Sequence, residues 1–389
     1  MNIAVLSPYC PAVDTTACAR KVFDCIALLR ARGHKIYLLS FCSRPDKPRI
    51  ARLKPYCEAF YLAHITNYYR YPRGSLLLTN TISALCANNT VDILQCENSF
   101  MARYIPENIN TPLVLTEHEV LSESFYQRIG FEKNVFRKCV LSLRTLKKLK
   151  EQKIWYAKFN KIIVFTRSDR EILLKLYGLK QIEVIPLGIN LKEYAPPEKK
   201  DSLADIIFTA NFSHLPNVDA ALFFYKCVLP LLRNKIPDIR MIFAGASPPG
   251  EVKRLAALDR NVTVTGYVED IKAAYAQAKL AVVPVRYGTG MCYKTLEAIA
   301  LGVPVVSTSV GARGIDHQGN IKVADSAENF AAAAADLLSN KAAREKTGEM
   351  AKYILEKEHD WVTLLTRYEK IYFDLLKKAK TKTAKKTVF

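Results

Sequence analysis

Glycines and cations gather in one short stretch of the sequence, residues 286–307. Gly288 and Gly290 stand there between an apolar run that favours a strand and a pattern that predicts a helix beginning near Met291. Glycine lets the backbone approach a ligand closely, and the first turn of a helix presents unpaired N–H groups at the positive end of its dipole. The stretch therefore predicts a phosphate site, and a nucleotide diphosphate suits it.

Charged side chains of both signs accompany this loop. Arg286 precedes the glycines and Lys294 follows them, so two cations bracket the predicted phosphate site. Glu297 lies one turn further along the helix, where a carboxylate can accept hydrogen bonds from sugar or ribose hydroxyls.

The elements that must position this loop alternate between strands and helices. Helical patterns include residues 17–32 and a helix up to Tyr177 with Ser168 and Asp169 as its N-cap. Runs typical of buried parallel strands occur at residues 2–7, 35–41, 59–63, 93–95, 113–116, 161–166, 183–186, 205–210, 240–244, 262–265, 280–284, 304–307 and 322–323. Such alternation predicts parallel sheets with helices on both faces.

The length of the chain indicates that these strands and helices form two domains. Its 389 residues exceed one compact core, and the polar stretch 188–201, with two prolines, favours a linker. Neither half carries G-x-G-x-x-G after its first strand, which argues against a dinucleotide-binding dehydrogenase. We predict an N-terminal domain at 1–190, a linker at 191–203, a C-terminal domain at 204–360, and a final helix with a basic tail at 361–389.

Composition bounds the cellular setting. Half of the residues are apolar, yet we find no apolar run long enough to span a bilayer, and residues 1–7 are typical of a strand rather than a signal peptide. The ten cysteines lack paired metal spacing, which favours reduced thiols over disulfides. We expect a cytosolic protein.

The formal net charge of +20 is concentrated in two places. Residues 137–161 hold nine Lys or Arg, one acid, and apolar side chains at roughly helical spacing, which indicates one or two basic amphipathic helices. Residues 377–389 add six lysines. A solvated end and an anionic membrane contact both fit this tail. No nucleic-acid recognition motif accompanies the charge, so nucleic acid is not expected as a partner.

Several motifs in order resemble a known family. They are the segments 184–190 (VIPLGIN), 207–220 (IFTANFSHLPNVDA) and 266–270 (GYVED), together with residues 286–307. Their order resembles the family 4 retaining glycosyltransferases of the GT-B fold, particularly bacterial sugar transferases of polysaccharide and lipopolysaccharide assembly. The resemblance implies two Rossmann-like domains with parallel sheets facing a cleft. It also implies that the amphipathic helix after Trp361, to about Leu376, crosses back to the N-terminal domain.

The resemblance implies transfer of a sugar from a UDP- or GDP-linked donor to a glycan or lipid-linked acceptor, with retention of anomeric configuration. It assigns catalytic roles to His118, Arg286, Lys294 and Glu297, with His118 orienting the donor sugar and Glu297 holding the ribose. Donor-binding positions are Gly288, Thr289, Gly290, Met291, Cys292, Tyr267, Val268 and Asn211. His214 and Asn217, in the loop before the next helix, are expected either to contact substrate or to cap that helix, and we favour capping.

The chain departs from the family pattern at two points. Thr289 replaces the first carboxylate of the E-x7-E motif, and Asn211 and Pro216 stand near positions where many members have Arg and Lys. No D-x-D pair is present, so we expect neither a metal nor another cofactor, with cations and a helix dipole in their place.

The implied acceptor predicts a cytoplasmic protein that is peripheral on the inner face of the cytoplasmic membrane, with an anionic membrane surface as partner. Two alternatives remain. One is a nucleotide-sugar epimerase or hydrolase of the same fold, using Glu97, Glu117 and Glu119; the other is a non-enzymatic basic binding protein.

Overall fold

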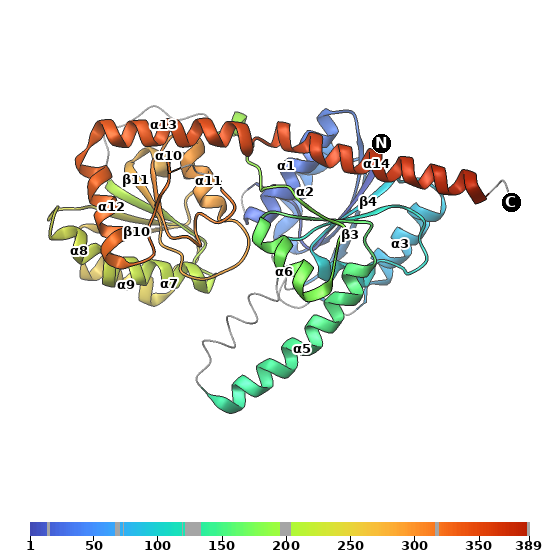
Figure 1. Cartoon of the computed structure of the whole chain (residues 1–389), viewed down its shortest axis with the longest axis horizontal. Helices are drawn as coiled ribbons and strands as arrows, with labels where there is room; N and C mark the ends of the chain where they lie inside the picture. Colours follow the sequence, from blue (N-terminus) through green and yellow to red (C-terminus); the bar gives the residue numbers. More distant parts are fainter. Residues whose placement is uncertain are drawn as a thin grey trace. The chain divides into compact units, whose positions relative to one another are not determined.

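The computed structural model describes residues 1–13, 16–66, 71–72, 74–118, 120, 134–194, 204–315 and 319–386 (Figure 1). The chain forms two compact units. Unit 1 comprises Met1–Pro186 and Trp361–Phe389, and unit 2 comprises Leu187–Asp360.

Unit 1 is built on a seven-stranded parallel sheet. Its central strands are buried because helices cover both faces of a parallel sheet, and they are mostly apolar, with Gln95 and Glu97 of β4 as buried polar residues. In sheet order the strands are β3 (Ala59–His64), β2 (Lys35–Cys42), β1 (Asn2–Ser7), β4 (Ile93–Glu97), β5 (Leu113–Thr116), β6 (Lys161–Val164) and β7 (Ile182–Val184).

The helices of unit 1 follow their capping residues. The predicted cap of α6 was wrong: Thr166, rather than Ser168 and Asp169, is the N-cap, and its hydroxyl accepts from the Asp169 N–H. The predicted basic segment is one helix, α5, which ends before Lys161 because Lys161 begins β6. The helices are α1 (Ala17–Ala31), α2 (Lys47–Leu53), α3 (Leu76–Ala87), α5 (Val135–Ala157), α6 (Arg167–Tyr177) and α14 (Trp361–Lys386), with 3₁₀ turns at Arg44–Asp46, Lys54–Tyr56 and Ser99–Tyr104.

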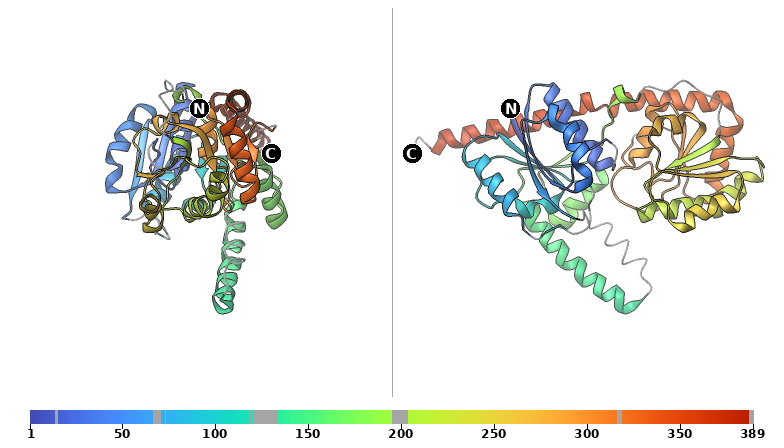
Figure 2. Two further views of the ribbon diagram at one scale, coloured as in Figure 1. Left: turned by 90° about the vertical axis from the view of Figure 1, so that its left-hand side faces the viewer. Right: turned by 180° about the vertical axis from the view of Figure 1, so that it is seen from behind.

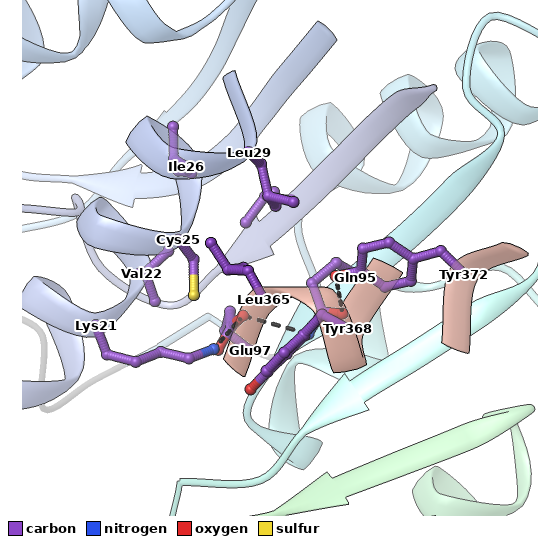
Figure 3. Close-up of a pocket in the computed structure, with 11 residues that line it drawn as sticks. Lys21, Val22, Cys25, Ile26, Leu29, Gln95, Glu97, Leu365, Tyr368 and Tyr372 are labelled. Carbon is purple, nitrogen blue, oxygen red and sulfur yellow. Dashed lines mark hydrogen bonds and ion pairs between the residues drawn. The ribbon is translucent and has the colours of Figure 1, made fainter. Parts of the chain in front are cut away.

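Helix α14 returns to unit 1 and packs on α1, as predicted for the C-terminal helix. Trp361, Leu365 and Tyr368 are buried, and the Tyr372 hydroxyl donates to Gln95 Oε1 at 3.0 Å (Figure 3). The helix continues to Lys386, ten residues beyond the predicted end at Leu376, because the pattern after that point is lysine-rich but not helix-breaking.

Unit 2 contains a six-stranded parallel sheet. In sheet order the strands are β10 (Val262–Gly266), β9 (Met241–Ala244), β8 (Ala204–Thr209), β11 (Ala278–Val283), β12 (Val305–Ser307) and β13 (Lys322–Val323). The helices are α7 (Leu215–Phe223), α8 (Leu229–Arg233), α9 (Gly250–Leu258), α10 (Ile271–Ala276), α11 (Tyr293–Ala300), α12 (Ala327–Ser339) and α13 (Lys341–Glu358), with a π-helical turn at Phe224–Val228 and a 3₁₀ turn at Leu191–Glu193.

One helical run in unit 2 corrects the expectation about membrane-length segments. Leu215–Arg233, which comprises α7, the π-helical turn and α8, is long and apolar enough to cross a bilayer by length and composition alone. Sequence periodicity missed it because Pro230 and Lys226 interrupt the apolar pattern. Phe224, Val228 and Leu232 in this run are buried, and the run packs on α12.

Candidate functional site

The glycine loop of unit 2 joins the carboxyl end of β11 to helix α11. Gly288 has a φ of +135° and Gly290 a φ of +74°, a region of backbone space that favours glycine. Helix α11 begins at Tyr293, two residues later than predicted, and Cys292 is its N-cap without a side-chain capping bond. The loop thus leads the chain directly into the first turn of a helix, as phosphate-binding loops do.

Lys294 lies in that first turn and is partly buried. Its Nζ donates to Asn217 Oδ1 at 2.6 Å and lies 4.7 Å from the centroid of the Phe208 ring. Among the described residues no carboxylate forms an ion pair with it, and burial lowers the pKa of Lys294 to about 8. The amine is therefore a partly buried cation whose contacts are a neutral amide and a ring.

The residues after β8 reach the same place. Asn217 was predicted to cap α7, but its amide instead accepts from Lys294 and donates to the Asn211 backbone oxygen at 2.7 Å. His214 is the N-cap of α7 without a side-chain bond, and burial, with Lys294 beside it, lowers its pKa. The structure therefore joins Asn211 to Lys294 through Asn217.

Arg286 is already paired with a carboxylate. Its Nε and a terminal nitrogen contact the two Asp219 carboxylate oxygens at 2.9 and 2.5 Å, and the guanidinium lies 4.6 Å from the centroid of the Phe223 ring. Asp219 is on α7, where sequence reasoning gave it no role. The Arg286 side chain remains 48% exposed, so part of its donor set still faces solvent.

Glu297 is held by a residue that sequence reasoning missed. The Tyr194 hydroxyl donates to Glu297 Oε1 at 2.8 Å, and Tyr194 is buried. Tyr194 follows a 3₁₀ turn in the stretch interpreted as a linker. An aromatic residue inside a polar, proline-containing stretch was the available signal.

A further cation approaches the loop from the segment after β12. The Arg313 guanidinium donates to the Gly288 backbone oxygen at 3.3 Å. Nothing in the local sequence around Arg313 points to this contact, because it depends on how the segment after β12 folds back.

The remaining predicted donor-binding residues lie along the same sheet edge or in the same loop. Asn211 follows β8, and Tyr267 and Val268 follow β10, with Tyr267 64% exposed. The carboxyl ends of parallel strands share one edge of a sheet. Thr289 lies between the two glycines, and Met291 Sδ accepts from the Leu187 N–H at 3.3 Å.

His118 belongs to unit 1, where it follows β5 and is buried in a charged network. Its Nε2 lies 2.5 Å from Glu97 Oε2 and its Nδ1 lies 3.2 Å from the Tyr9 hydroxyl. Lys21 Nζ donates to both Glu97 oxygens, at 2.8 and 2.9 Å (Figure 3). Burial opposes the imidazolium, but Cys18 and Glu97 outweigh it and raise the pKa of His118 to about 9. The Glu97 carboxylate therefore favours the imidazolium form of His118.

The carboxylates of the epimerase alternative are placed differently from one another. Glu97 is ionised and ion-paired, whereas burial raises the pKa of Glu117 to about 7, and Glu117 Oε2 accepts from Tyr156 at 2.9 Å. Glu119 lies outside the described residues. Within the described ranges, no group of three His, Cys, Asp or Glu is arranged to hold a metal ion.

Two family models match the chain. Residues 19–193 match the glycosyltransferase family 4 model, and residues 204–340 match the glycosyl transferases group 1 model. Together they span most of both units. The chain belongs to the family 4 glycosyltransferases.

A curated relative of this glycosyltransferase is an uncharacterized 44.6 kDa protein in the cps region of Klebsiella pneumoniae, 21% identical over 80% of the chain and 84% of the relative. Three solved structures are similar over nearly their whole length. Sucrose-phosphate synthase from Thermosynechococcus elongatus has a TM-score of 0.72 at 17% identity, covering 97% of this chain and 99% of that one.

Anabaena Alr3699/HepE, solved with UDP and glucose, has a TM-score of 0.69 at 16% identity, covering 96% of this chain and 100% of that one. WaaG, a glycosyltransferase involved in lipopolysaccharide biosynthesis, has a TM-score of 0.64 at 15% identity, covering 95% and 99%. These likenesses confirm the predicted fold class, GT-B with two parallel-sheet α/β domains.

Proposed function

We propose that this glycosyltransferase takes a sugar from a UDP- or GDP-linked donor and passes it to an acceptor hydroxyl with retention of anomeric configuration. The observation that carries the proposal is the amine of Lys294, placed in the first turn of α11 directly after the Gly288–Gly290 loop with no ion-pair partner among the described residues. A partly buried ammonium beside a helix N-terminus favours a ligand with several negative charges.

The difficult step is departure of the nucleoside diphosphate, which accumulates negative charge as the sugar becomes cationic. Lys294, the N–H groups of the loop and Arg286 would stabilise that charge from fixed positions, which is the most effective form of electrostatic catalysis. Arg286 would do so while paired with Asp219, which fixes its guanidinium over Phe223. We propose that these groups act without a metal or other cofactor.

Glu297 would hold the nucleotide ribose through its carboxylate. The hydrogen bond from Tyr194 would fix the orientation of this carboxylate toward the ribose hydroxyls. Tyr267 and Val268 would lie beside the base, and Thr289 would face the donor sugar with a hydroxyl in place of the usual carboxylate. His118 would orient the donor sugar as a cation whose ring is fixed by Glu97 and Tyr9.

The acceptor we propose is a lipid-linked glycan or lipopolysaccharide, handled by a cytoplasmic enzyme that is peripheral on the inner face of the membrane. Two observations support this acceptor class: the similarity to WaaG, a glycosyltransferase involved in lipopolysaccharide biosynthesis, and the basic amphipathic helix α5.

The test incubates the purified protein with a panel of UDP- and GDP-sugars and a lipid-linked glycan acceptor extract, with and without EDTA. We expect nucleoside diphosphate release with one donor, persistence in EDTA, and a product whose anomeric proton coupling matches that of the donor. Glu297→Ala and Arg286→Ala should abolish transfer, whereas Glu349→Ala, an exposed glutamate on α13, should not change it. Inversion of the anomer would contradict the retaining mechanism, and loss of activity in EDTA would contradict catalysis without a metal. Full activity of Glu297→Ala would contradict the role proposed for Glu297.

A further inference from the structure

Helix α5 exposes apolar side chains that the fold does not use. Five large hydrophobic residues on it are 56–78% exposed: Val135, Phe136, Leu143, Leu146 and Ile154. Their spacing, together with exposed Cys139 between them, places them along one stripe of a helix with 3.6 residues per turn. We name this set the α5 stripe.

The opposite side of α5 is the one that packs on unit 1. Thr145, Gln152 and Tyr156 are its buried residues, and the helix contacts the 3₁₀ turn Ser99–Tyr104. Tyr156 also donates to Glu117. The helix is therefore anchored through a mostly polar face near its C-terminal end. Both views in Figure 2, like Figure 1, show the rest of α5 extending away from unit 1.

The charges on α5 indicate what covers the stripe. Seven Lys or Arg and one acid, Glu151, lie within its 23 residues. The basic residues are Arg137, Lys138, Arg144, Lys147, Lys148, Lys150 and Lys153. A second copy seated stripe to stripe would bring two such sets together, and like charges repel. An anionic bilayer complements the charges and also accepts the apolar stripe.

We propose that α5 lies on the surface of an anionic membrane, with the α5 stripe among the lipid headgroups and acyl boundary and its lysines contacting lipid phosphates. Long lysine side chains can extend from the flanks of the stripe to the phosphates while their methylene groups stay on apolar surface. This deepens the membrane location in the proposed function. It concerns lipid binding alone, so it can fail while sugar transfer stands.

The test is co-sedimentation of the full chain with extruded vesicles of phosphatidylcholine, with and without one quarter phosphatidylglycerol, in the absence of any nucleotide-sugar. Wild type should bind the anionic vesicles and lose most binding in 0.5 M salt. Leu143→Glu/Leu146→Glu should weaken binding at least tenfold. Leu258→Glu, which changes a leucine of α9 that is 74% exposed, is the matched control and should bind as wild type does.

Lys147→Gln/Lys148→Gln/Lys150→Gln should remove the preference for anionic vesicles while leaving far-ultraviolet circular dichroism unchanged, because these side chains are exposed. Wild-type binding by Leu143→Glu/Leu146→Glu would overturn the proposal, as would equal binding to both vesicle types. A wild-type dimer that binds no vesicles and becomes monomeric in Leu143→Glu/Leu146→Glu would overturn it in favour of a second copy.

Discussion

Lys294 is a partly buried cation whose direct contacts stabilise its charge only weakly. An amide oxygen and the Phe208 ring are weak partners for an ammonium compared with a carboxylate, and burial lowers its pKa to about 8. A bound diphosphate would stabilise the ammonium and raise that pKa. Binding and protonation of Lys294 are therefore linked.

This linkage predicts the pH dependence of nucleotide affinity. Because the ligand favours the protonated amine, affinity should be full below pH 8 and fall as pH rises above it, by up to about tenfold per unit. Lys294→Arg keeps its charge throughout this range and should flatten the profile. Calorimetric titrations at pH 7, 8 and 9 measure both. Parallel profiles for wild type and Lys294→Arg would show that Lys294 does not titrate against the ligand.

Glu117 predicts a second pH effect, on stability. Burial raises its pKa to about 7, so the folded state favours the protonated acid, and stability is lost as pH rises from about 4.5 to 7. Glu117→Gln removes this loss while keeping an acceptor for Tyr156. The difference in free energy of unfolding, variant minus wild type, should increase by about 1–3 kcal/mol from pH 5 to pH 8. Urea unfolding at the two pH values tests this, and an equal difference at both would contradict it.

Single residues of the candidate site could be predicted from the sequence where their role depends only on the local conformation of the chain. The Gly288–Gly290 loop and Lys294 could be located from glycine conformation and helix termini. Tyr194, Asp219 and Arg313 could not, because each meets the site through a contact far away in the chain.

The ends of three neighbouring strands in unit 2 pack so closely that one position requires glycine. Gly245, at the end of β9, has a φ of +140°, and a Cβ there would lie 1.8 Å from the Ala210 backbone oxygen after β8. Its N–H donates to the backbone oxygen of Gly266, the last residue of β10. Three strand ends near the candidate site therefore depend on a residue without a side chain.

Gly245→Ala should destabilise unit 2 by several kcal/mol, since both backbone strain and overlap with a main-chain atom are imposed. Gly250→Ala, at the start of α9, is the matched control because a Cβ there meets nothing within 4 Å. Thermal unfolding of the two variants distinguishes them. Equal melting temperatures would show that the strand ends can separate without cost.

Periodicity predicted the elements better than their ends. The thirteen strands of the described residues were all expected, most of them because buried parallel strands are nearly continuously apolar; β13, whose two residues are exposed, is the exception to this reason. The start of α11, the cap of α6 and the end of α14 were misplaced, because these depend on single hydrogen bonds or on tertiary packing rather than on a repeating pattern.

On the scale of the whole molecule, the chain length and the two runs of alternating elements predicted two parallel-sheet units. The return of α14 to unit 1 could be expected only through the family resemblance, because an amphipathic pattern does not say which domain its apolar face will cover. The net charge of +20 must be balanced by counterions in the solvent or by a negatively charged partner. Helix α5 carries part of this charge.

We propose that unit 2 binds a nucleoside diphosphate through Lys294 and the glycine loop. Isothermal titration of UDP and of GDP into wild type and Lys294→Gln at pH 7 tests it most directly. One nucleotide should bind wild type, and Lys294→Gln should weaken that binding at least tenfold with an unchanged melting temperature of the unliganded protein. Equal affinity of the two proteins for that nucleotide would contradict the account.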